Sequence, residues 1–119
     1  MAQTLSRALN VGDWISVIKT NVTSPVNIKS TPGIIGAIHV DNSGSTANAF
    51  VQLIDASGAG TLGTNVIDVI TILAGDAGGI VYPMPGVYAS NSGLSVGVST
   101  TFNGSTVIGT GVNVSVLYK

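Results

Sequence analysis

The feature that most constrains this chain is an alternation of apolar and polar residues with a period of two. The pattern is clearest in residues 94–99 and 112–118, where one set of side chains is apolar: Leu94, Val96, Val98, Val112, Val114, Val116 and Tyr118. Successive side chains of a strand point to opposite faces, so this pattern predicts strands with one buried face. Turn residues interrupt the pattern roughly every 8–12 residues, a spacing typical of a β-sandwich or barrel.

The predicted strands occupy nearly the whole chain after its first dozen residues, and no helical period extends beyond the first ten residues. They cover residues 14–19, 26–29, 33–41, 46–55, 65–73, 80–82, 87–89, 94–99 and 112–118, with 106–108 pairing before the last strand or continuing it. Without helical crossovers the sheets should be antiparallel. We therefore expect an all-β fold, a two-sheet antiparallel sandwich of about eight strands of jelly-roll or Greek-key type.

The most detailed prediction is a hairpin of residues 33–41 and 46–55, joined by the loop 42–45 and pairing Asp41 with Thr46. In that register one face is wholly apolar, with the pairs Val40/Ala47, Ile38/Ala49, Gly36/Val51 and Ile34/Leu53. The other face holds His39/Asn48, Ala37/Phe50 and Ile35/Gln52. A slip of one residue would mix the two faces, so the alternation favours this register.

The surface of this sandwich must be nearly uncharged. Only 8% of the residues are charged, four basic and five acidic, against roughly 25% in an average soluble protein. Too few basic residues are present to follow a phosphate backbone, so we expect no nucleic-acid partner. A neutral surface costs little to desolvate, which suits burial between subunits. The alternative is a soluble monomer with a neutral polar coat.

The ends of the sequence suggest one domain preceded by an arm. Residues 1–12 lack strand alternation and form a predicted N-terminal arm, while 13–119 form one β-sandwich domain. No secretory signal or membrane-spanning segment is visible, so we expect no membrane partner. The chain has no cysteine, which excludes disulfides and cysteine chemistry.

No motif indicates catalysis or a cofactor. Residues 58–63 match Gly-x-Gly-x-x-Gly, but a predicted strand follows where a dinucleotide site needs a helix. Ser16 and Lys19 match Ser-x-x-Lys, yet in a strand they point to opposite faces. His39 has Asp41 on its face but no evident third metal ligand, and Asp68 needs a polar partner if it is buried. We therefore expect no enzyme, no catalytic residues, no cofactor and no metal site.

The candidate contact residues are partly apolar and partly polar. The hairpin register assembles Phe50 with His39, Asn48 and Gln52, a patch that could touch a partner chain or a glycan, or lie under a loop. Trp14 is a plausible anchor beside the arm, which could order on a neighbour. The predicted partner contacts are Leu5, Arg7, Leu9, Trp14, His39, Asn48, Phe50 and Gln52.

Three segments resemble the small β-sandwich virion proteins of tailed bacteriophages: residues 33–55, residues 80–88 with Gly93 and Leu94, and the closing 112–119. The likeness is one of style, a neutral strand protein rich in Gly, Ser, Thr and Val. It implies a capsid decoration or cement subunit in the virion, made in the host cytoplasm. The implied partners are its own copies, for example in a trimer, and a major capsid or tail protein. A tail or fibre subunit and a carbohydrate-binding module are the alternatives.

Overall fold

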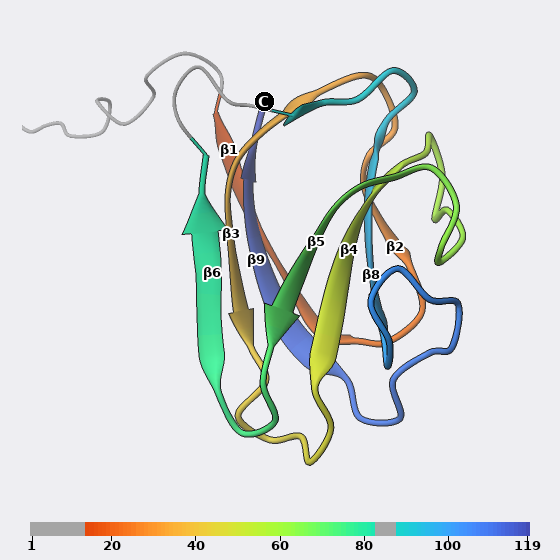
Figure 1. The fold of residues 1–119 in the computed structure, drawn as a ribbon. Coiled ribbons are helices and arrows are strands. Elements are labelled where there is room, and N and C mark those ends of the chain that lie inside the picture. The colour runs from red at the N-terminus through yellow and green to blue at the C-terminus, as the bar shows by residue number, and fades with distance from the viewer. Residues whose placement is uncertain (1–13, 83–87) are drawn as a thin grey trace, which may run out of the picture.

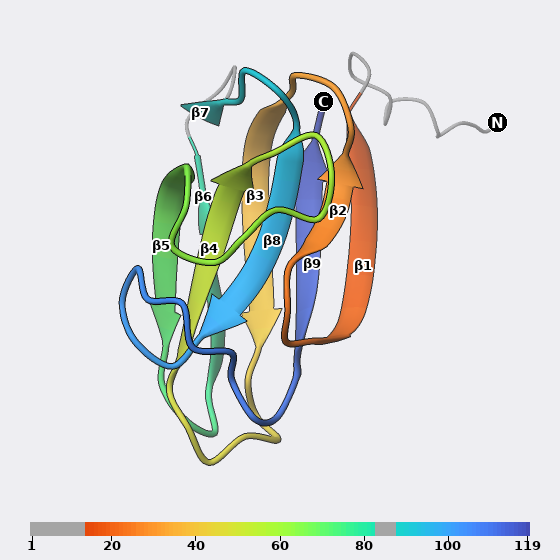
Figure 2. The same ribbon diagram turned by 90° about the vertical axis from the view of Figure 1, so that its right-hand side faces the viewer.

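The computed structural model describes residues 14–82 and 88–119, and in these residues the chain forms strands with no helix (Figures 1 and 2). The residues proposed as an arm, 1–12, lie outside the described part. The strands are β1 (Ile15–Val22), β2 (Val26–Lys29), β3 (Ile34–Asp41), β4 (Ala49–Asp55), β5 (Val66–Ile72), β6 (Ala77–Val81), β7 (Tyr88–Ala89), β8 (Leu94–Ser99) and β9 (Val112–Tyr118).

The strands pair as nested antiparallel partners. β1 pairs with β9, β2 with β8, β3 with β6 and β4 with β5, so that each early strand meets a late one. The pairs β3–β9 and β4–β8 join these couples into sheet A, with order β1-β9-β3-β6, and sheet B, with order β2-β8-β4-β5. The two-residue β7 pairs with the start of β3. This order is that of a jelly roll, which confirms the predicted two-sheet antiparallel sandwich.

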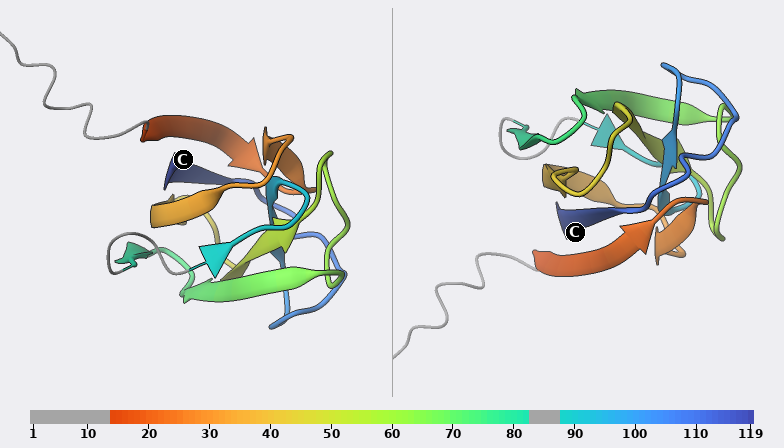
Figure 3. Two further views of the ribbon diagram at one scale, coloured as in Figure 1. Left: turned by 90° about the horizontal axis from the view of Figure 1, so that it is seen from above. Right: turned by 90° about the horizontal axis from the view of Figure 1, so that it is seen from below.

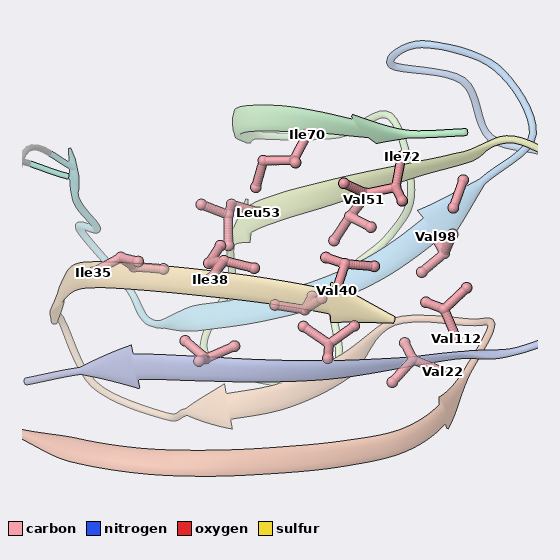
Figure 4. Close-up of a cluster of buried hydrophobic side chains, with 14 of the residues drawn as sticks. Val22, Ile35, Ile38, Val40, Val51, Leu53, Ile70, Ile72, Val98 and Val112 are labelled. Carbon is pink, nitrogen blue, oxygen red and sulfur yellow. The ribbon is translucent and has the colours of Figure 1, made fainter. Parts of the chain in front are cut away.

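The core fills the space between the sheets, and the views along the strands show the two layers facing each other (Figure 3). Every residue predicted to point inward in 94–98 and 112–116 is buried: Leu94, Val96, Val98, Val112, Val114 and Val116. β-Branched side chains from both sheets interdigitate in this layer (Figure 4). Burying one such side chain contributes about 1.5–3 kcal/mol, so this layer is the main source of stability.

The predicted pairing of residues 33–41 with 46–55 in a hairpin is wrong, but most of the side chains predicted to be buried in these two strands are buried. β3 lies in sheet A and β4 in sheet B, so the two strands face each other across the core instead of lying side by side. Ile38, Val40, Val51 and Leu53 are all buried, as the alternation predicts. Alternation reports which side of a strand is buried, but it does not report which strand lies beside it.

The loop between β3 and β4 crosses from one sheet to the other at the bottom of Figure 1. Asn42 holds it there: its side-chain Nδ2 donates to the backbone oxygens of Ala47 at 3.0 Å, Ile72 at 3.3 Å and Leu73 at 3.1 Å. The backbone N–H of Asn42 also donates to the Asp76 oxygen at 2.9 Å. This buried amide therefore joins the β3–β4 connection to the β5–β6 turn, and long-range polar contacts of this kind leave no periodic signal.

A bulge in β3 changes which isoleucine is buried. The pairing of β3 with β9 shifts between Ile35 and Ala37, so that Gly36 is the extra residue. As a result Ile35 is fully buried while Ile34 is only half-buried, the reverse of the prediction. An ideal Cβ on Gly36 would lie 2.8 Å from a ring carbon of Trp14, so glycine is required for this close approach.

Other elements differ from the predicted ones as well. β1 extends to Val22, beyond the predicted end, β4 begins at Ala49 instead of residue 46, and β6 begins at Ala77, before its predicted start. Gly79 lies within β6, close to the backbone of β3. A Cβ at this position would collide with the Ile38 carbonyl oxygen, so the close approach of the two strands requires glycine. Residues 106–108 pair with the end of β8, through a bridge between Val107 and Ser99, instead of with β9.

Asp55 fixes the loop that enters β8. Its carboxylate accepts hydrogen bonds from the backbone N–H groups of Asn91 at 3.1 Å, Ser92 at 2.8 Å and Gly93 at 3.3 Å. These donors, that of Ser92 first, hold the pKa of Asp55 below its ordinary value of 3.8. The folded state therefore favours the ionised carboxylate at this position.

The pairing of β3 can be tested with engineered disulfides, because the chain has no cysteine of its own. Ala37 is opposite Val81 in the β3–β6 ladder, so the double variant Ala37→Cys/Val81→Cys should oxidise to an intramolecular disulfide. The variant Ala37→Cys/Phe50→Cys, which matches the hairpin register, should stay reduced. Mass spectrometry after mild oxidation distinguishes them, and a disulfide only in the second variant would contradict the jelly-roll pairing.

Asp55 should make folding depend on acid. Because its folded pKa lies below its unfolded pKa, its stabilising contribution is complete above the unfolded value and is lost as pH falls through the folded value. We expect Asp55→Asn to lower the free energy of unfolding at neutral pH by about 1 kcal/mol, since water screens this partly exposed carboxylate. Urea unfolding between neutral and acidic pH measures the effect.

The variant should also show a weaker loss of stability on acidification than the natural chain. Asp76→Asn is the matched control, because the Asp76 side chain is exposed in a turn. Equal acid sensitivity of the natural chain and Asp55→Asn would contradict the role assigned to this carboxylate.

Candidate protein interface

The two outer faces of the sandwich differ in how they are covered. All six residues of β8, in the middle of sheet B, are buried, although only alternate ones face the core. Leu62 and Pro25 lie against Gly97 on its outer side, and the Ser95 hydroxyl donates to the backbone oxygen of Ala59. The loops that follow β4 and β8 cross this side of the molecule in Figure 2. The protein's own loops therefore cover the outer side of β8 and β4, the central strands of sheet B, while Thr71 of the edge strand β5 is exposed.

Gln52 joins two of these covering loops. The residue is fully buried on the outer side of β4. Its Nε2 donates to the Gly104 oxygen at 2.7 Å and to the Ser99 hydroxyl at 3.2 Å, while its Oε1 accepts from the Gly63 N–H at 2.7 Å. One amide thereby binds the loop after β4 and the loop after β8, and it has no surface left for a partner.

Phe50 lies beside this amide and is also under a loop. Its ring meets that of Phe102 edge-on, with centroids 6.4 Å apart and planes at 84°. Phe50 is half-buried, while Phe102 is 67% exposed. The alternative that this phenylalanine lies under a loop is therefore the one the structure shows.

The outer face of sheet A has no such cover among the described residues. The register places its side chains in rows across the strands. One row is Ser16, Leu117, Ala37 and Val81; the next is Ile18, Ser115, His39 and Gly79; and the third contains Asn113, Asp41 and Ala77. We call these residues, together with Trp14, the sheet A face.

Large apolar side chains on the sheet A face reach into solvent. Ile18 is 68% exposed and Val81 is 81% exposed. Between them Leu117, Ala37 and the neighbouring small residues border a shallow hollow of about 230 Å³, with Gly79 and Ser115 on its lining. A partly apolar face with few charges and a hollow is the kind of surface that protein partners cover.

Trp14 closes one end of this face. Its ring lies over Gly36, on the same side as Leu117, because the backbone of β3 has no side chain there. The Lys119 ammonium lies 5.8 Å from the ring centroid. A cation–π contact of this kind contributes about 0.5–1 kcal/mol at an exposed site, and it holds the tryptophan near the chain's last strand.

The two ionisable groups in the rows of the sheet A face are His39 and Asp41. The side-chain and backbone hydrogen bonds from Ser43 lower the pKa of Asp41, the backbone N–H donating at 3.0 Å. Asp41 therefore serves the adjacent turn as an ionised acceptor. Within the described residues no three His, Cys, Asp or Glu side chains form a group able to hold a metal ion.

The structure separates the residues that the sequence placed in one patch. His39 lies on the sheet A face, while Phe50 and Gln52 lie on the opposite side of the sandwich. Trp14, predicted separately as an anchor, also lies on the sheet A face. The Asn48 side chain accepts from the Ala74 N–H at 2.9 Å, at the turn that follows β5. Leu5, Arg7 and Leu9 lie outside the described residues. The predicted patch is therefore wrong, because it depended on the hairpin pairing of β3 with β4.

Sequence reasoning missed Ile18 and Val81 as surface residues, although one signal was present. Ile15, Val17 and Ile18 cannot share one face of a strand, so at least one apolar residue of β1 had to face outward. Ser16 and Lys19 do lie on opposite faces, as predicted, because Ser16 pairs with Leu117 and Lys19 with the buried Val114.

Asp68 has the polar partner that its position in a strand requires. It pairs with the buried Leu53 and so points toward the inner side at the edge of sheet B. The Tyr82 hydroxyl donates to its Oδ2 at 2.5 Å, and the Val69 N–H donates to its Oδ1 at 2.9 Å. The acid is thus used in holding the end of β6 against β5.

No known protein family, curated protein or solved structure matches the chain. In the part of the chain that the structure describes, no helix is long and apolar enough to cross a membrane. The surfaces of the molecule are therefore the evidence on its function.

Replacing Gln52 tests whether it is structural. Gln52→Leu keeps a similar volume but leaves the Gly104 oxygen, the Gly63 N–H and the Ser99 hydroxyl without this partner. We expect the free energy of unfolding in urea to fall by about 2–4 kcal/mol. Ser105→Ala, at an exposed position of the same loop, should change it little. Unchanged stability of Gln52→Leu would contradict the assignment.

Proposed function

We propose that this chain is a non-enzymatic structural subunit that adheres to other protein through the sheet A face. The observation that supports this most directly is the contrast between the two sides of the sandwich. Loops cover the outer side of β8 and β4, the central strands of sheet B, whereas the sheet A face exposes Ile18 and Val81. An exposed apolar surface with polar groups around it is typical of a site that another protein covers, so we assign these side chains to association.

The chemistry of the face suits burial. It holds hydroxyl, amide and apolar groups, with His39 and Asp41 as the ionisable groups of its rows. Neutral groups of this kind lose little hydration energy when covered, while each Å² of apolar surface removed from water contributes about 25 cal/mol. Adhesion therefore needs shape complementarity more than charge.

The specific role we propose is that of a capsid decoration or cement subunit of a virion. The jelly roll is an architecture on which viral capsid domains are built, and lectin domains as well. The resemblance of the sequence to phage virion proteins points the same way. A subunit that binds only the assembled shell stabilises that shell by mass action, so cementing requires no chemistry beyond binding.

A tail or fibre subunit would use the same face, and the number of copies per particle separates the two roles. A carbohydrate-binding module would need several aromatic rings on one surface. Here Trp14 lies on the sheet A face and Phe102 beside sheet B, on opposite sides of the sandwich. The described aromatic residues therefore favour protein over glycan as the partner.

The proposal predicts that a charge on the sheet A face abolishes adhesion without unfolding the chain. Ile18→Asp should weaken co-sedimentation with empty capsid shells of the encoding virus by about tenfold or more, because the new carboxylate must be desolvated. Thr71→Asp, on an exposed outward position of sheet B, is the matched control and should bind normally.

Thermal unfolding of both variants should match that of the natural chain, because both positions are exposed. Binding that is unaffected by Ile18→Asp but lost with Thr71→Asp would contradict the proposed face. Absence of the chain from purified particles, or saturable glycan binding by a monomer, would contradict the proposed function itself.

A further inference from the structure

Three of the four outer strand edges carry devices that oppose pairing with another chain. On β1, Lys19 points to the inner face opposite Val114, and the ladder shifts between Lys19 and Val22, where Asn21 has a φ of 54°. A charge directed inward and a bulge both prevent a new strand from continuing the sheet. The β1 edge of sheet A is therefore protected.

Both edges of sheet B are protected as well. β2 is four residues long, begins directly after Pro25 and has a register shift between Asn27 and Lys29. β5 carries Asp68 on its inward side. Short strands, proline, bulges and inward-directed charges are the usual protections of an edge.

β6, the remaining edge of sheet A, has none of these features except modest length. Its sequence, Ala-Gly-Gly-Ile-Val, contains no charge and no proline, and it pairs with β3 without any register shift. The strand stands at the left edge of Figure 1, and in the described residues no strand pairs with its outer side. Two large apolar side chains of β6 are accessible to solvent: Ile80 is 39% exposed and Val81 is 81% exposed.

The hydrogen-bonding groups on this edge alternate in direction. The Tyr82 N–H donates to the Gly36 oxygen of β3 at 2.9 Å, so Ile80 and Gly78 also face β3. In an antiparallel sheet the alternate residues Ala77, Gly79 and Val81 direct their N–H and C=O groups away from that neighbour. β6 therefore offers the backbone groups of these residues to an incoming strand.

We infer that β6 is the site at which a second copy of this chain adds to sheet A, β6 pairing antiparallel with β6 about a two-fold axis near Ile80. In that register Val81 of each copy lies opposite Gly79 of the other. The exposed valine of one strand thus meets the position without a side chain on its partner, next to the hollow of the sheet A face. One strand supplies both the projecting group and the space for it, which makes the edge self-complementary.

Such a pairing has a consequence for the inner side of the sandwich as well. Ile80 is opposite the buried Ile38 and so points inward, yet it is partly exposed because β6 is the last strand. On the two-fold axis the isoleucines of the two copies become neighbours and cover each other. The dimer also places two sheet A faces side by side in one continuous sheet.

The test measures self-association of the full chain by sedimentation equilibrium over a range of concentrations. We expect a dimer, and we expect Val81→Lys and Val81→Pro each to raise its dissociation constant by about tenfold or more. Lysine places two like charges across the axis, while proline removes an N–H that points away from β3 and is tolerated on a free edge. Ile18→Lys, an exposed apolar position on the opposite edge strand, is the matched control and should dimerise normally.

Amide exchange supplies an independent readout in the natural chain. The amides of Gly79 and Val81 should become protected as concentration rises, while that of Tyr82 is protected throughout because it bonds to Gly36. A monomer at all concentrations would overturn the inference, as would a dimer abolished by Ile18→Lys alone. It would also be overturned if deletion of residues 2–12 abolished the dimer and the Val81 variants did not. Each of these results leaves the shell-binding experiment to decide the proposed function separately.

Discussion

Burial of alternating apolar side chains between two sheets is the interaction on which the rest of this structure depends. Ile38 and Val40 of sheet A meet Val51 and Leu53 of sheet B across the core, and the nested pairing of early strands with late ones is what brings the two sheets together. Because the ladder partners are mostly far apart in sequence, few of them can form before the chain has collapsed. Local pairing therefore does little to position the turns and loops, and specific polar contacts hold them in place.

Two buried amides and one carboxylate make those polar contacts, and each of the three side chains holds a different loop connection. Asn42 joins the β3–β4 crossing to the β5–β6 turn, Gln52 joins the two loops over sheet B, and Asp55 holds the entry to β8. A chain with few charges cannot use ion-pair networks for this purpose. It uses single polar side chains that satisfy two or three backbone groups at once, and the two amides, Asn42 and Gln52, do so where water is excluded.

The sequence predicts the strands and their buried sides well, and it predicts their neighbours poorly. The period-two pattern depends on local geometry, so β2 and β8 have the predicted bounds and Val112, Val114 and Val116 point inward. Pairing depends on the relative stability of whole arrangements. The residues predicted as a four-residue hairpin loop, 42–45, belong instead to the crossing between the sheets, which takes residues 42–48. The candidate patch was predicted from the hairpin pairing. Because that pairing is wrong, His39 and Gln52 lie on opposite sides of the sandwich instead of side by side.

Gly79 shows why the edge was the part least accessible to sequence reasoning. Glycine is common in turns, and the pair at 78–79 follows a turn, so its position in a strand has no local signature. Its effect depends on the neighbouring strands. The missing side chain lets β6 approach β3 and leaves a gap in the rows of side chains on the outer face of sheet A.

The unprotected edge β6 and the sheet A face belong to the same sheet, so pairing at the edge changes how the face binds. A single sheet A face is small, and association has a large entropic cost that a small uncharged contact offsets only in part. Two faces held rigidly in one sheet bind a repeating surface with a much higher effective concentration for the second contact. A lattice presents such repeats, whereas a single soluble partner does not. Pairing at β6 would therefore make a weak face into a selective one, which engages an assembled shell and leaves its unassembled subunits free.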